Sequence, residues 1–109
     1  MTESRYHLLV AEAFRKLEDA VADLDPEDVD VDSAGDVVTL TLKGSQRCIV
    51  NTQRPTRQIW VAWAAKGRAW HFSYDEAQQR WLDDKGHGEE LFATLKTIVK
   101  ETAGVDIAV

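Results

Sequence analysis

Between residues 37 and 74 the sequence contains a series of strand-like segments that are separated only by short turns. The segments are residues 37–42, 47–51, 58–62 and 69–74, and residues 80–82 add a short fifth candidate. They are rich in β-branched and aromatic residues, which favour strands. Turns this short can join antiparallel strands but not parallel ones, which need a long crossover. The sequence therefore predicts an antiparallel sheet in the middle of the chain.

Two segments with the period of an amphipathic helix flank the predicted sheet. Apolar residues recur about every 3.6 positions from residue 6 to 24 and again from 91 to 102. Ser4 is the expected N-cap of the first helix, and Pro26 should end it, because a proline disfavours helical geometry at the residue before it. Both helices can cover one face of the sheet. We expect an α+β two-layer sandwich with an antiparallel sheet of about five to six strands.

The chain length and the single cysteine limit the class of protein. With 109 residues, the chain is expected to form one domain over residues 1–109. Cys48 is the only cysteine, so no internal disulfide can form, and its place between strand residues predicts a buried thiol. No apolar run approaches the roughly 20 residues that span a bilayer, and residues 1–5 open into polar sequence. These features favour a cytoplasmic protein without a membrane partner.

Charge is distributed very unevenly along the chain. Residues 1–36 contain 11 acidic and 3 basic side chains, a net charge of −8, whereas residues 37–109 carry a net charge of +2. A negative region of this size argues against nucleic acid as a partner, because phosphate neutralisation dominates that affinity. It favours cations or a basic protein surface instead.

The acidic residues near the N-terminus form a pattern that suits cations. At about 100° per residue, Glu12, Asp19 and Asp23 fall together on the side of the first helix opposite its apolar residues. The strip continues in Asp25, Glu27, Asp28, Asp30 and Asp32, of which the last three alternate with valines. Carboxylates without His or Cys among them suit hard cations, and an open strip should bind them weakly. The alternative is a solvated helix face that binds no ligand.

One predicted strand displays polar side chains next to an aromatic ring. If Ile59 and Val61 face the helices, Gln58 and Trp60 point to solvent. The exposed group, here called the sheet-face patch, consists of Asn51, Gln53, Gln58 and Trp60. Amides and nearby arginines around such a ring are typical of a protein-interface hot spot, although they can also stack single-stranded nucleic acid. The acidic balance of the chain favours a protein partner.

No group of residues has the pattern of a catalytic centre. His7, His71 and His87 are scattered and provide no paired zinc ligands. The glycines are isolated, so neither a phosphate-binding loop nor a nucleophile elbow is present. We expect no enzymatic activity from these patterns.

The segment NTQRPTRQIWVA, residues 51–62, resembles the signature of the frataxin family, an Asn-x-Gln-x-Pro-x-x-Gln-[Ile/Val]-Trp-[Leu/Val] pattern. The resemblance covers nearly the whole chain, including the acidic first helix, the turn at Gly35, Trp70-His71-Phe72, Trp81 and the closing helix. It implies a helix-sheet-helix sandwich that binds iron and assists iron–sulfur cluster assembly.

The same resemblance implies two functional surfaces. The first, here called the acidic ridge, consists of Glu18, Asp19, Asp23, Asp25, Asp28, Asp30 and Asp32. It would hold Fe(II) or Fe(III) weakly, with Glu3 and His7 as additional contacts. The second is the sheet-face patch, which would meet the assembly partners, a cysteine desulfurase and its iron–sulfur scaffold protein. A monomer is the expected state, with iron-dependent oligomers as the alternative.

Two other functions stay open from the sequence. The sheet-face patch could bind a peptide or single-stranded nucleic acid around Trp60, while the acidic residues only keep the chain soluble. A ferroxidase-like oxidation of Fe(II) has precedent in the family, although the paired Glu-x-x-His pattern of a di-iron site is not present. The sequence does not distinguish iron donation, iron storage and desulfurase inhibition, since all three can use the same weak surface.

Overall fold

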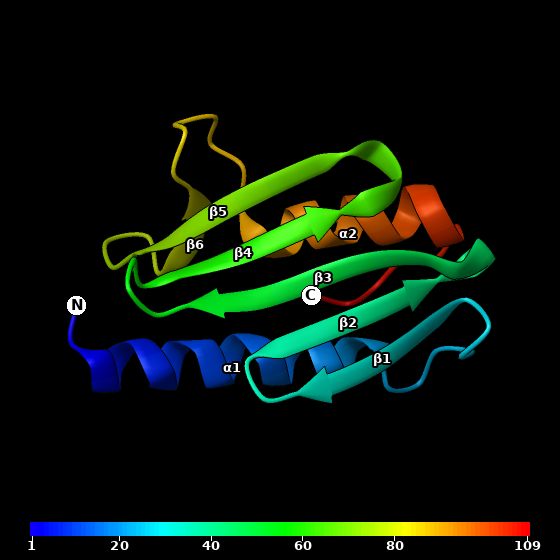
Figure 1. Ribbon diagram of the computed structural model, residues 1–109, viewed down its shortest axis with the longest axis horizontal. Helices are drawn as coiled ribbons and strands as arrows, with labels where there is room; N and C mark the ends of the chain where they lie inside the picture. The colour runs from blue at the N-terminus through cyan, green and yellow to red at the C-terminus, as the bar shows by residue number, and fades with distance from the viewer.

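The computed structural model describes residues 1–109 and has the order helix, six strands, helix (Figure 1). Its elements are α1 (Glu3–Val21), β1 (Val29–Ala34), β2 (Val37–Leu42), β3 (Gln46–Gln53), β4 (Gln58–Trp63), β5 (Arg68–Asp75), β6 (Arg80–Asp83) and α2 (Leu91–Ala103). Each strand pairs antiparallel with the next, so β1 and β6 are the two edges of the sheet. The predicted α+β sandwich with an antiparallel sheet is confirmed.

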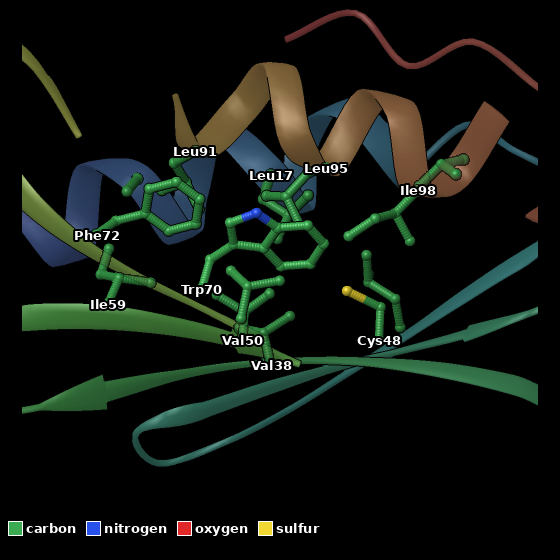
Figure 2. Packing of buried hydrophobic residues seen from close by; sticks show 14 of the residues in the cluster. Leu17, Val38, Cys48, Val50, Ile59, Trp70, Phe72, Leu91, Leu95 and Ile98 are labelled. Atoms are coloured by element: carbon green, nitrogen blue, oxygen red, sulfur yellow. The ribbon is translucent and has the colours of Figure 1, made fainter. Parts of the chain in front are cut away.

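Both helices cover the same face of the sheet. Figure 1 shows α1 and α2 behind the strands, and Figure 2 shows side chains of the two layers meeting between them. Alternation along the strands turns Val50, Ile59 and Phe72 toward Leu17 and Leu95 of the helices, and all five are at most 1% exposed. Burying each such side chain contributes about 1.5–3 kcal/mol. The core therefore lies on one side of the sheet, and its other face carries no helix.

The first helix begins earlier than the sequence predicts. The N-cap of α1 is Thr2, whose side-chain oxygen accepts a hydrogen bond from the Arg5 N–H at 3.1 Å. The prediction of Ser4 as the N-cap is wrong, because Thr2 has the extended backbone that an N-cap needs, whereas Ser4 already lies in the first turn of the helix. α1 ends at Val21, before the proline that should stop it.

The second helix is capped at both ends, and the chain after it returns to the core. The Glu90 carboxylate accepts hydrogen bonds from the N–H groups of Phe92 and Ala93 at the start of α2. Gly104 ends α2 with a φ of 74°, a left-handed conformation that suits glycine. In the tail that follows, Ile107 is 2% exposed. The C-terminal tail thus adds Ile107 to the hydrophobic core.

Two further observations bear on the class of protein. None of the helices combines the length and the apolar character needed to cross a membrane. Cys48 is fully buried on β3, and burial raises the pKa of its thiol to about 12. The prediction of a buried cysteine is confirmed, and the thiol stays protonated at neutral pH.

Candidate functional site

The acidic ridge follows the end of α1, the connecting loop and the edge strand β1. Its residues are Glu18 and Asp19 on α1, Asp23, Asp25 and Asp28 in the loop, and Asp30 and Asp32 on β1. α1 and β1 lie side by side (Figure 1). The fold therefore gathers all seven carboxylates at one side of the molecule.

Alternation along β1 turns its carboxylates away from the core. Val29 is 2% exposed and Val31 packs against the core, whereas Asp30 and Asp32 are exposed. The predicted alternation is confirmed for these two aspartates. Asp28 lies in the turn before the strand and is half-buried. The two strand aspartates are thus accessible from solvent.

A shallow groove along α1 brings acidic and basic side chains together. Glu12, Asp19 and Asp23 line it, as the helical period predicts, although α1 has ended before Asp23. Arg15 and Lys16 line the same groove. Neighbouring cations therefore offset part of the like-charge repulsion expected among these carboxylates.

Two ridge carboxylates already have protein partners. The Ser33 hydroxyl donates a hydrogen bond to Glu18 at 2.5 Å and so ties β1 to α1. The Asp25 carboxylate accepts the N–H of Glu27 at 2.9 Å inside the loop. The other five ridge carboxylates accept no hydrogen bond from the protein and form no ion pair. These five are free to bind a ligand.

The ridge has no preformed cage for a metal ion. Nowhere in the chain do three or more His, Cys, Asp or Glu side chains lie close enough together to hold one ion. An ion on the ridge would take one or two carboxylates from the protein and keep water as its remaining ligands. Such an oxygen donor set suits hard cations and holds them weakly.

Glu3 and His7 form a separate pair near the start of α1. The His7 Nε2 and Glu3 Oε1 atoms are 3.5 Å apart, and both side chains are exposed. At 1.5 Å per residue, His7 is about 17 Å from Glu18 along the helix axis. The structure therefore does not join this pair to the ridge.

The sheet-face patch lies on the β3–β4 hairpin, on the face without helices. In the register of the hairpin, Asn51 is opposite Trp60 and Gln53 is opposite Gln58, so the four predicted residues are neighbours. Trp60 is half-buried. Gln58 is only 8% exposed, so the prediction that its side chain points into solvent is wrong. The side chains around Gln58 cover it.

A network of side chains binds the Gln58 amide. The Trp60 indole N–H donates to Gln58 Oε1 at 2.9 Å, and Gln58 Nε2 donates to Asp84 Oδ2 at 2.9 Å and to Ser73 Oγ at 3.1 Å. The Trp60 ring stacks on His71, with ring centroids 4.1 Å apart and planes inclined by 16°. The network joins β4 and β5 to the loop that follows β6.

Sequence reasoning did not assign three members of this network to the patch. His71 and Ser73 are opposite Trp60 and Gln58 in the β4–β5 register, so strand pairing was the signal that could have found them. Asp84 lies outside the strands, and no local pattern marks it. Its position depends on the path of the loop after β6.

Tyr6 anchors the same hairpin from the helix layer. Its hydroxyl donates to the Gln58 carbonyl at 2.6 Å and accepts the Gln53 N–H at 3.2 Å. The side chain is fully buried, and burial raises the pKa of its phenol. A residue of α1 therefore holds both ends of the loop in the hairpin that carries the patch.

The chain matches the family model of the frataxin-like domain over residues 1–105. The iron–sulfur cluster assembly protein CyaY of Pseudomonas aeruginosa is 40% identical over 107 residues, which cover 98% of this chain and 95% of that protein. CyaY of Pseudomonas fluorescens strain Pf0-1 is 39% identical over 106 residues, with coverages of 97% and 93%.

Solved structures show the same fold. Frataxin from Psychromonas ingrahamii has a TM-score of 0.86 at 25% identity and covers 98% of this chain and 96% of its own. Trimeric frataxin from Saccharomyces cerevisiae, complexed with ferrous iron, has a TM-score of 0.63 at 22% identity, with coverages of 94% and 86%. The second likeness concerns the fold alone. The chain belongs to the frataxin family, in the group of CyaY iron–sulfur cluster assembly proteins.

Proposed function

We propose that this protein is an iron-binding accessory and regulator of iron–sulfur cluster assembly in the cytoplasm. The observation that carries the proposal is the set of five exposed or half-buried ridge carboxylates that have no partner within the protein. These carboxylates form no contact that the fold depends on, so they are available to a cation. Membership of the CyaY group supports iron as that cation.

The proposed binding of Fe(II) and Fe(III) is weak and exchangeable. Each ion contacts one or two carboxylate oxygens of the ridge and otherwise keeps its water, because no three ligating side chains converge. Weak binding suits an accessory that passes iron on or senses it. The yeast frataxin trimer with ferrous iron motivates a further part of the proposal, that the protein is a monomer without iron and forms oligomers with it.

The proposed partners are a cysteine desulfurase and its scaffold protein. The ridge lies in the part of the chain with a net charge of −8, so it fits a basic surface on the desulfurase. The sheet-face patch presents a half-buried Trp with polar neighbours, which suits a contact of defined geometry. The two surfaces would then meet different parts of one assembly complex.

An anaerobic Fe(II) titration of the ¹⁵N-labelled protein tests the metal role. We expect amide shifts or broadening at residues 18–32, with no equivalent effect from NaCl at the same ionic strength. Neutralising two exposed carboxylates by Asp30→Asn with Asp32→Asn should weaken the effect. The matched control, Glu101→Gln with Asp106→Asn, removes the same charge outside the ridge and should leave it unchanged. Effects that salt reproduces, or that arise elsewhere, would contradict the proposal.

A further inference from the structure

The exposed face of Trp60 is held in one orientation by contacts on two sides. Its ring stacks on His71, and its indole N–H is bound by the Gln58 side-chain oxygen. Trp60 offers an amphipathic ring of the kind that anchors protein interfaces. A ring whose orientation is fixed before binding loses less side-chain entropy when a partner docks.

Gln58 can hold the indole only if its own amide is fixed. A free amide can rotate and present either its oxygen or its nitrogen to Trp60. Here Nε2 is committed to two acceptors, Asp84 Oδ2 and Ser73 Oγ, which leaves Oε1 facing the indole N–H. Because a carboxylate oxygen is a stronger acceptor than a hydroxyl oxygen, the hydrogen bond to Asp84 is the stronger of the two.

The backbone and a second ring hold Asp84 in place. Its N–H donates to the His71 carbonyl at 2.8 Å, which extends the β5–β6 pairing by one residue. The N–H of the preceding Asp83 donates to the Glu89 carbonyl at 2.9 Å. The same Asp84 Oδ2 atom lies 3.7 Å from His71 Nδ1. One carboxylate therefore faces both residues that contact the Trp60 ring, Gln58 and His71.

We propose that Asp84 is a positioning residue of the sheet-face patch, which fixes the Gln58 amide and thereby the orientation of the Trp60 indole for docking. The proposal rests on the proposed function, because it assumes that Trp60 contacts the assembly partner. It assigns a role to a loop residue outside the signature segment. It also makes Gln58 a support for Trp60, consistent with its 8% exposure.

The test combines a measurement on the free protein with a binding measurement. Trp60→Phe removes one of four indole cross-peaks from the ¹⁵N–¹H spectrum and so assigns the Trp60 indole. In Asp84→Ala we expect that cross-peak to shift and its heteronuclear NOE to fall, while the other three stay in place. Affinity for a purified bacterial cysteine desulfurase–scaffold complex should fall about threefold to tenfold, the value of one hydrogen bond.

Two variants control this experiment. Asp84→Asn keeps an oxygen that can accept from Gln58, so it should retain the Trp60 cross-peak and bind within about twofold of the native protein. Glu101→Ala removes one carboxylate from α2, in the layer opposite the patch, and should change neither readout. Thermal unfolding of each variant shows whether the fold is intact.

The outcomes separate this inference from the proposed function. An unchanged Trp60 cross-peak in Asp84→Ala would overturn the positioning role, whatever the affinity. A changed cross-peak with native affinity would also overturn it, provided that Trp60→Ala weakens binding. Native affinity in Trp60→Ala itself would remove the docking role of the patch and, with it, this inference. A shifted Trp60 cross-peak with weaker binding in Asp84→Ala, together with a native cross-peak and near-native affinity in Asp84→Asn, would support it.

Discussion

The acidic ridge and the sheet-face patch differ in how their side chains are held. Most ridge carboxylates have no partner in the protein and lie on a loop and an edge strand. The Trp60 and Gln58 side chains, on a central strand, are bonded and stacked to their neighbours. The first arrangement tolerates changes of geometry and responds to total charge. The second depends on the position of individual atoms.

This comparison predicts that the two surfaces fail in different ways. Substitutions in the ridge should act through charge and lose their effect at high salt, because exposed charges are screened. Substitutions in the patch should act through contact and remain effective at any ionic strength.

The largest effect is expected from charge reversal in the ridge. Asp19→Lys with Asp23→Lys should weaken binding to cysteine desulfurase about 100-fold or more at low salt, because close charge pairs at an interface are worth several kcal/mol. Binding measured by calorimetry at rising NaCl should show the native and variant affinities converge. The control, Glu101→Lys with Asp106→Lys, changes net charge equally outside the ridge. Retained affinity in the ridge variant would remove the ridge from docking.

Trp60→Ala should weaken binding of the desulfurase–scaffold complex by about 30-fold, the loss of about 2 kcal/mol typical of an aromatic hot spot. The loss should be the same at low and high salt. The iron-dependent shifts at residues 18–32 should persist. If the loss disappears at high salt, the patch does not differ from the ridge in the way proposed.

Tyr6→Phe tests the anchor beneath the patch. The substitution leaves the buried Gln58 carbonyl and Gln53 N–H without the Tyr6 hydroxyl, so the free energy of unfolding should fall by about 1–3 kcal/mol. Urea denaturation followed by Trp fluorescence measures it. Removing a ridge carboxylate, as in Asp30→Asn, should not lower stability, which gives the contrast between the regions. An equal loss in both variants would count against the comparison.

Alkaline pH should weaken the same anchor. Burial raises the pKa of Tyr6 above its ordinary value of about 10, so the folded state holds the proton more tightly than the unfolded chain. This contribution is complete below pH 10 and is lost as pH rises through the folded-state value. Unfolding curves between pH 9 and 12 should therefore decline less steeply in Tyr6→Phe. Burial also raises the pKa of Cys48, to about 12, so part of the loss of stability at high pH should remain in both proteins.

The smallest effect is expected from cations on the ridge. A cation that binds only the folded state stabilises it by RT ln(1 + [L]/Kd), about 0.4 kcal/mol when its concentration equals Kd. Calorimetric scans should show Tm rise by about 2 °C with divalent cations. Salt should raise Tm as well, by screening the carboxylates. The Asp30→Asn, Asp32→Asn variant should respond less. A Tm that does not change in the native protein would contradict ridge binding.

The sequence predicts the fold well where periodicity is local. Alternation identified the five strands from β2 to β6, and the 3.6-residue period identified both helices, because each pattern follows from the local geometry of one element. The edge strand β1 was anticipated only as an alternation of acidic residues with valines. The outward direction of Trp60 followed from the same alternation. The N-cap at Thr2 was missed because Thr2 and Ser4, two positions apart, are both capping residues, and the general preference for Ser pointed to the wrong one.

The site was predictable only in part, because much of it is tertiary. The burial of Gln58 depends on Asp84, which reaches it through the course of a loop. Placing His71 and Ser73 beside Trp60 and Gln58 required the β4–β5 register, which the sequence of β5 alone does not specify. The separation of His7 from the ridge follows from the length of α1 that lies between them. The role of the ridge in iron binding remains a prediction.

The placement of β1 at an edge of the sheet has a consequence for self-association. An edge strand exposes unpaired backbone groups that can pair with a strand of another molecule and start aggregation. On β1 the exposed side chains include Asp30 and Asp32, whose charges repel the same strand of a second copy. The carboxylates proposed to bind iron therefore also keep the chain dispersed. A cation that neutralises them would weaken this protection and bring two copies closer to edge-to-edge pairing.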